Sequence, residues 1–138
     1  MTIKELSQLY YLNREIEGDQ KRLAELEATC APAAAPLTGL PRAPGVGSPT
    51  EQLAVEIADL KAIILAKQIQ CIHERARLER YIAAIDDSET RWVCTLRFVN
   101  GLPWAQVAAH LGNGQTVDRV KKVCYRYLNK SNETREDQ

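Results

Sequence analysis

The feature that most constrains the fold is an apolar repeat between Leu53 and Ile85. Most of its members recur at steps of three, four or seven residues, which matches the 3.6-residue turn of an α-helix. At about 1.5 Å per residue such a helix is about 50 Å long. A stripe of this length needs a second helix to cover it. The repeat consists of Leu53, Ile57, Leu60, Ile64, Cys71, Leu78, Tyr81, Ile82 and Ile85.

A similar stripe begins the chain and supplies a partner. Residues 1–29 are rich in Leu, Glu, Ala, Lys and Arg, which favour helix, and their apolar positions are Leu9, Leu12, Ile16, Leu23 and Leu26. We expect residues 1–29 and 50–86 to form a long antiparallel helical hairpin, a coiled-coil-like stem. The first helix packs either on its own chain or on a neighbour's, so a homodimer through the stem is also expected. Asp19, Lys67 and Glu74 lie on or beside this seam, and either select its register or lie close to solvent.

Proline and glycine mark the division between the two stem segments. Apart from Pro103, every proline falls between Cys30 and Thr50, together with Gly39, Gly45 and Gly47. This composition predicts a flexible linker over residues 30–49. The chain therefore reads as one small domain joined to an extension.

Residues 87–130 carry signals for three further helices. Asp86 with Glu89 resembles a capping box that starts the first of them. A corner follows at Asn100–Pro103, and Pro103 suits the first turn of a short helix because that turn needs no N–H donor. The turn at Gly112–Gly114 lets the chain leave that helix in the left-handed αL conformation. The inward face of the short helix consists of Trp104, Val107, Ala108 and Leu111.

The last helix has one apolar and one basic face. We expect it to start near Thr116, whose hydroxyl accepts from free N–H groups, with Asp118 at the positive end of the helix dipole. Arg119, Lys122 and Arg126 share an outer face at i, i+3 and i+7. The expected buried stripe consists of Val117, Val120, Cys124, Tyr127 and Leu128.

The run from Leu96 to Gly112 resembles the promoter-reading helix-turn-helix of bacterial sigma factors (their region 4) and of related response regulators. In that pattern a Leu-Arg-aromatic helix precedes Gly-Leu, then an aromatic residue, an aliphatic-Ala pair and Leu-Gly, as in this chain. Val120-Lys121 followed by Arg126 is similar to the family's recognition helix. With its helical N-terminal half, the whole arrangement also resembles small phage-encoded late transcription regulators of the ArpU and RinA type.

The resemblance implies an all-α protein whose C-terminal three-helix helix-turn-helix domain binds double-stranded DNA. Arg119, Lys121, Lys122 and Tyr125 would approach base edges or phosphates, and Arg126 a phosphate. Gln115 and Thr116 would contact the DNA backbone, and Asp118 would accept from cytosine or stabilise the dipole. The implied function is a sequence-specific transcription regulator encoded by a phage or prophage. The alternative for the basic face is an ordinary solvated helix surface.

Charge is balanced overall but unevenly distributed. The chain has 18 basic and 18 acidic residues, so bulk electrostatics alone do not indicate nucleic acid. Basic residues outnumber acidic ones between Ser88 and Lys130, whereas acidic residues dominate before Cys30. Residues 131–138 contain no apolar side chain, and we expect a disordered tail there.

The sequence lacks the motifs of several functional classes. The four cysteines form no Cys-x-x-Cys pair, which argues against a zinc or redox site. We find no catalytic triad, carboxylate pair or phosphate-binding loop, so we expect neither an enzyme nor a cofactor or metal. Trp92 and Trp104 are expected to pack in the core. Without a signal peptide or a run of roughly 20 apolar residues, we expect the cytoplasm of a bacterial host cell and no membrane partner.

Two other functions fit the same helices. Small terminase subunits, which package DNA, also pair a helix-turn-helix with helical oligomerisation segments and assemble as rings. Alternatively, the C-terminal helices bind RNA polymerase as an adaptor that makes no contact with DNA. RNA polymerase is also a candidate partner of a DNA-binding regulator.

Overall fold

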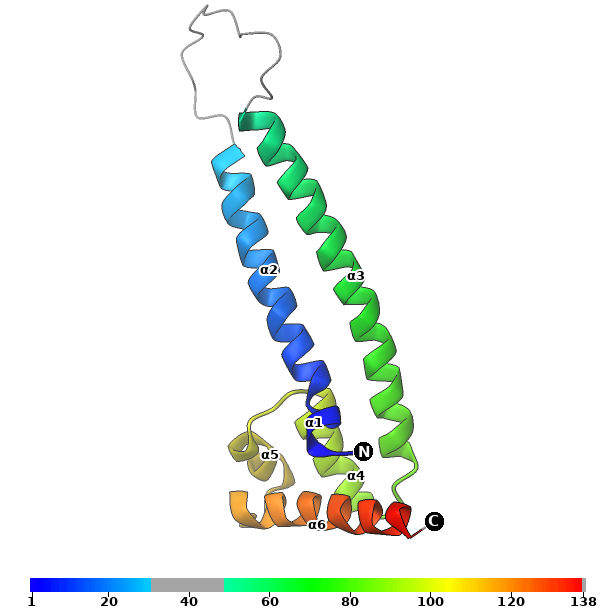
Figure 1. Cartoon of the computed structure of the whole chain (residues 1–138). Helices are drawn as coiled ribbons and strands as arrows, with labels where there is room; N and C mark the ends of the chain where they lie inside the picture. The colour runs from blue at the N-terminus through cyan, green and yellow to red at the C-terminus, as the bar shows by residue number, and fades with distance from the viewer. Residues whose placement is uncertain (31–48, 138) are drawn as a thin grey trace, which may run out of the picture. The chain divides into compact units, whose positions relative to one another are not determined.

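The computed structural model describes residues 1–30 and 49–137. In these ranges it contains helices and no strand, which confirms the all-α prediction. The linker predicted over residues 30–49 lies, apart from its two ends, outside the described residues. The elements are α1 (Ile3–Leu6), α2 (Gln8–Cys30), α3 (Pro49–Ala83), α4 (Ser88–Cys94), the π-helix η1 (Thr95–Val99), α5 (Trp104–Leu111) and α6 (Val117–Glu136) (Figure 1).

The chain divides into two compact units, and α2 and α3 each contribute to both. The stem unit is Arg14–Ile69, and the head unit is Met1–Asn13 with Gln70–Gln138. The head unit is thus larger than residues 87–130, because the start of the chain and the end of α3 belong to it.

Ion pairs join α2 and α3 in the stem unit. Lys67 Nζ lies 2.6 Å from Asp19 Oδ2, and Lys61 Nζ lies 3.4 Å from Glu27 Oε1. Because residue 19 pairs with 67 and residue 27 with 61, the helices run antiparallel here. The hydrogen bond with Asp19 raises the pKa of Lys67. Asp19 and Lys67, which interrupt the apolar stripes, therefore satisfy each other.

The core of the head unit draws on every helix in it. Leu6 and Leu9 from the start of the chain pack with α3, α4, η1, α5 and α6. The fully buried side chains are those of Leu6, Leu78, Ile85, Val93, Cys94, Val107, Val120, Cys124 and Leu128. The residues expected to form the first stem helix thus also complete the head core.

The first predicted helix is interrupted near its start. Thr2 and Glu5 form a capping box, in which Thr2 N donates to Glu5 Oε2 at 2.6 Å and Glu5 N donates to Thr2 Oγ1 at 3.3 Å. These bonds lower the pKa of Glu5. The short α1 ends at Ser7 and α2 begins at Gln8. Residues 1–29 therefore form two helices rather than the single one expected.

The joint between α3 and α4 also differs from the prediction. The helix expected to reach residue 86 ends at Ala83, because Ala84 N and Ile85 N bond to carbonyls only three residues back. The residue that caps α4 is Asp87 rather than Asp86. Its carboxylate accepts from Thr90 N at 2.9 Å and from the Thr90 hydroxyl, and the hydroxyl bond is the main reason that the pKa of Asp87 is lowered.

The predicted disordered tail is wrong for most of its length, because α6 continues to Glu136. Ser131 Oγ donates to Leu128 O at 3.0 Å, and Thr134 Oγ1 donates to Lys130 O at 2.9 Å. A helix already anchored by buried Leu128 extends at little cost, since each further residue adds a backbone bond without new nucleation. Lack of apolar residues therefore does not end this helix.

Candidate nucleic-acid interface

The turn between α5 and α6 has an unusual backbone. Gly112 has φ 65° and ψ −159°, a combination that is essentially confined to glycine. Asn113 and Gly114 follow with φ of 52° and 71°. Gly112 therefore does not take the αL conformation that we expected, although its φ is positive. A β-branched residue could not replace it without strain.

The start of α6 agrees with the prediction. Thr116 is the N-cap, and its side-chain oxygen accepts from Arg119 N at 3.2 Å. Asp118 lies in the first turn, where a carboxylate interacts favourably with the helix dipole. The first turn of α6 is thus fixed by local contacts, and its side chains start from a defined position.

One face of α6 holds the helix on the head core. Val120, Cys124 and Leu128 are buried, and Val117 and Tyr127 are half-buried. The thiols of Cys124 and Cys94 form a hydrogen bond, which together with burial raises the pKa of Cys124. Both thiols are free and fully buried. The predicted apolar stripe is therefore the face that packs inward.

The predicted DNA-contacting residues fall into two groups. Five are exposed, namely Thr116, Asp118, Arg119, Lys122 and Arg126. Gln115, Lys121 and Tyr125 are half-buried. Within the described ranges no carboxylate forms an ion pair with the side chains of Arg119, Lys121, Lys122 or Arg126. The cationic groups on this face are therefore not neutralised by the chain itself there.

The structure brings part of the basic face together along an open hollow on α6. The hollow has a volume of about 520 Å³. It is lined by Lys122, Tyr125, Arg126, Asn129, Lys130 and Glu133. Arg119 lies one turn before Lys122. The predicted site omits Asn129 and Lys130, although their i+3 and i+4 spacing from Arg126 could have placed them on this face.

Tyr125 also fixes the position of α6 against α5. Its ring meets that of Trp104 edge to face, with centroids 5.9 Å apart. The Arg97 guanidinium lies 4.9 Å from the centre of the Trp104 ring, and its Nη1 donates to Leu102 O at 2.9 Å. This stack of Arg97, Trp104 and Tyr125 joins the corner before α5 to α6.

Gln115 lies in the turn rather than on the free surface. Its Oε1 is buried and has no hydrogen-bond partner in the part of the chain that the structure describes. Its backbone N–H donates to Gly112 O at 3.2 Å. Of the two residues expected to contact the DNA backbone, only Thr116 is exposed.

Trp92 contradicts its predicted place in the core, because 49% of it is exposed. An α-helical period places it one turn from buried Leu96. The buried residues of α4 are instead Thr90, Val93 and Cys94, at i, i+3 and i+4, and Trp92 lies off this face. The π-helix η1, in which Asn100 N bonds to Thr95 O five residues back, begins only after Trp92. Trp104, by contrast, packs against the core as expected.

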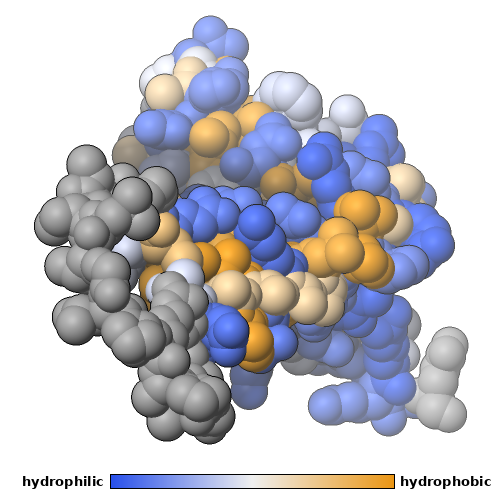
Figure 2. Space-filling view, turned by 90° about the horizontal axis from the view of Figure 1, so that it is seen from above, coloured by the Kyte–Doolittle hydropathy of each residue, from blue (hydrophilic) through white to orange (hydrophobic). Residues whose placement is uncertain are grey.

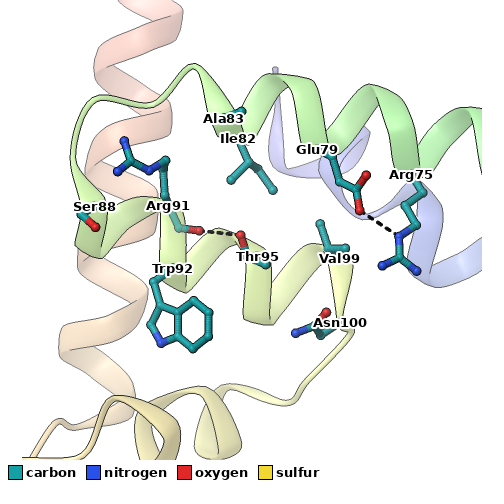
Figure 3. Close-up of a pocket in the computed structure, with 10 residues that line it drawn as sticks. All are labelled: Arg75, Glu79, Ile82, Ala83, Ser88, Arg91, Trp92, Thr95, Val99 and Asn100. Carbon is teal, nitrogen blue, oxygen red and sulfur yellow. Dashed lines mark hydrogen bonds and ion pairs between the residues drawn. The ribbon is translucent and has the colours of Figure 1, made fainter.

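Trp92 borders a separate pocket of about 500 Å³ in the head unit (Figure 3). Figure 3 shows its ring below Thr95, whose hydroxyl donates to Arg91 O at 2.8 Å. Across the pocket, Arg75 Nε lies 2.9 Å from Glu79 Oε1. Of the two arginines that line this pocket, Arg75 is paired with Glu79, and Arg91 Nη1 donates to the carbonyls of Ile85 and Asp86. This pocket therefore offers less free charge than α6.

The described ranges contain neither a candidate metal site nor a candidate membrane span. There, no three His, Cys, Asp or Glu side chains are grouped so that they could hold a metal ion. None of the helices described is both long and apolar enough to span a bilayer.

Comparisons with known proteins give no match for this chain, whether with family models, with curated proteins or with solved structures. The geometry of α5, the turn and α6 must therefore support any functional proposal by itself.

Proposed function

We propose that this chain is a sequence-specific transcription regulator that binds double-stranded DNA through a helix-turn-helix made of α4 with η1, α5 and α6. The observation that carries the proposal is the two-faced character of α6. Its apolar face is fixed in the head core, and its opposite face presents Arg119, Lys122 and Arg126 to solvent without a carboxylate partner among the described residues. The phage or prophage context comes from the resemblance alone.

The chemistry of this face suits the major groove. That groove admits one α-helix, and arginine can pair with both acceptors of guanine there. Lysine and arginine that neutralise phosphates release counterions and so supply affinity. In this proposal Arg119, Lys121 and Lys122 face bases or phosphates, the exposed Thr116 lies at the DNA backbone, and Arg126 contacts a phosphate.

The contacts around α6 support a fixed reading position. The glycine-dependent turn sets the path into α6, the Thr116 cap sets its first residue, and the edge-to-face contact of Trp104 with Tyr125 holds it against α5. A side chain that reads a base edge must be held to well under an ångström. These contacts provide that rigidity without using the basic side chains of Arg119, Lys122 and Arg126.

The antiparallel helices of the stem unit suit a coiled-coil-like hairpin that pairs two copies. Helix-turn-helix dimers bind two half-sites about one helical turn of DNA apart. In this proposal the stem serves dimerisation, RNA polymerase is a further partner at the promoter, and the protein acts in the cytoplasm of the bacterial host.

Selection of genomic fragments tests the proposal. Purified full-length protein is mixed with sheared bacterial and prophage DNA at physiological salt, and the retained fragments are sequenced. We expect enrichment of one sequence as an inverted repeat. The same selection with Arg119→Ala/Lys122→Ala is the comparison. Equal enrichment with both proteins, or none with the native one, would refute the role of α6.

A further inference from the structure

A second apolar stripe runs along α3, apart from the one that faces α2. Figure 2 shows orange, apolar side chains at the surface among blue, polar ones. On α3 the large members are Val55, Leu65, Ile69 and Ile72, of which 59%, 58%, 49% and 67% are exposed. Exposed side chains of this size are costly to leave in water.

The spacing of this stripe is that of a coiled-coil seam. Its positions follow steps of three and four without a break, which are the a and d positions of a heptad. They are Val55, Ala58, Ala62, Leu65, Ile69, Ile72 and Ala76. The residues that face α2 belong to a different series, since Ile64 is buried and Leu53, Ile57 and Leu60 are half-buried.

We propose that this stripe is the seam along which α3 pairs with α3 of a second copy of the chain, antiparallel. In that orientation Ala58 packs against Ile69 of the second copy, Ala62 against its Leu65, and Val55 against its Ile72. Each layer then joins a smaller side chain to a larger one, which fills space evenly. A parallel pair in register would instead set Ala58 against Ala58 and Ala62 against Ala62, leaving gaps.

Charge along α3 favours the same orientation. Its first turns carry Glu51, Glu56 and Asp59 with no basic residue, whereas basic residues predominate from Lys61 to Arg80. Antiparallel pairing places the acidic end of one helix beside the basic end of the other. Glu51 belongs to the same series of steps as the stripe. It would lie opposite the uncharged Ala76 of the second copy, but opposite the like charge of Glu51 in a parallel pair.

The choice of a second copy follows from this self-complementarity. The same helix supplies both the small and the large member of each layer, and both the acidic and the basic end. The inference rests on the proposed function only to explain what the dimer is for, since a regulator that binds paired half-sites needs two copies. Its tests use no DNA, so the seam and the DNA-binding face can fail separately.

Mass measurement in solution is the first test. The native full-length chain is expected to be a dimer, and Leu65→Gln/Ile69→Gln/Ile72→Gln a monomer with unchanged helical circular dichroism. The control replaces three exposed apolar residues outside the stripe, Ile3, Tyr11 and Ile63, by Gln and should remain a dimer. A native monomer, a ring of eight or more copies, or a stripe variant that still dimerises overturns the proposal.

Disulfide cross-linking tests the orientation. Ala58→Cys and Ile69→Cys are made separately in a Cys30→Ser/Cys71→Ser background, which leaves only the buried Cys94 and Cys124. We expect a cross-linked dimer when the two proteins are mixed, and none from Ala58→Cys alone, since its two copies would lie about 17 Å apart along the axis. A disulfide needs Cα atoms within about 7 Å. Cross-linking of Ala58→Cys alone, or no cross-link in the mixture, overturns the antiparallel seam.

Discussion

Gly112→Ala should destabilise the head unit through its backbone alone. A Cβ added at Gly112 meets no atom within 4 Å, so no steric clash with neighbours contributes. The φ of 65° and ψ of −159° nevertheless belong to a region that an L-residue enters at a cost of about 1–3 kcal/mol. We expect the free energy of unfolding of the head unit to fall by about that amount, and α6 to leave its position against α5.

Two glycines serve as matched controls because a Cβ also meets nothing within 4 Å at either. Gly114→Ala, at φ 71°, should cost about 1–2 kcal/mol. Gly18→Ala, inside α2, should stabilise its helix by about 0.5–1 kcal/mol.

The assay is urea unfolding followed by tryptophan fluorescence, because Trp92 and Trp104 both belong to the head unit and report on it alone. Circular dichroism in the same samples reports on all helices. We expect Gly112→Ala to have the lowest urea midpoint by fluorescence, and Gly18→Ala to have the same midpoint as the native chain. If Gly112→Ala unfolds at the native midpoint, the strained turn does not exist as described, and the argument for a fixed α6 loses its basis.

Three further predictions concern the head unit and use the same fluorescence assay. Thr116→Ala removes the cap of α6 and should cost about 1 kcal/mol, whereas Thr134→Ala, near the end of the same helix, should change little; equal losses would exclude a capping role. Trp104→Ala should lower the free energy of unfolding by about 2–4 kcal/mol because the ring packs on the core. Trp92→Ala should lower it by less than half as much, because Trp92 is half-exposed. The reverse order would mean that the faces of α4 and α5 are misassigned. Because hydrogen bonds from Thr90 lower the pKa of Asp87 below its ordinary 3.8, its stabilising contribution is complete above that pH and is lost as the pH falls through the lower folded value. Asp87→Asn should abolish this part of the acid dependence, and an unchanged pH profile would show that the cap does not titrate as inferred.

Features that depend on local chemistry can be predicted from the sequence. Thr116 is recognisable as a cap because a hydroxyl before an amphipathic stretch satisfies free N–H groups whatever surrounds it. Pro103 marks the start of the short helix one residue later than expected: its φ of −59° suits a helix, but its ψ of 151° makes it the N-cap rather than the first helical residue. The buried stripe of α6 follows from a period that α-helices keep. Each of these is decided within about one turn of chain.

Features that depend on distant contacts could not be predicted in the same way. Leu6 and Leu9 belong to the head core because the start of the chain packs against residues far along the sequence. No local sequence pattern predicts such a contact. The prediction for Trp92 is wrong because the face of α4 that is buried consists of Thr90, Val93 and Cys94, and being one turn from a buried residue does not place Trp92 on that face. The stripe from Val55 to Ala76 is easily overlooked because the stripe facing α2 already explains why α3 is a helix. Only the exposed fractions separate the two faces.

The central claim is that the free basic face of α6 binds DNA phosphates, and salt dependence measures it most directly. Affinity for the duplex recovered by genomic selection is measured over a range of salt concentrations for the native chain and for Arg119→Ala/Lys122→Ala. Lys21→Ala/Arg22→Ala, which removes the same charge from exposed residues of α2, is the control. We predict that the slope of log affinity against log salt falls by about 0.9 for each phosphate that α6 no longer neutralises and does not change in the control. An unchanged slope and affinity in the α6 variant would contradict the account.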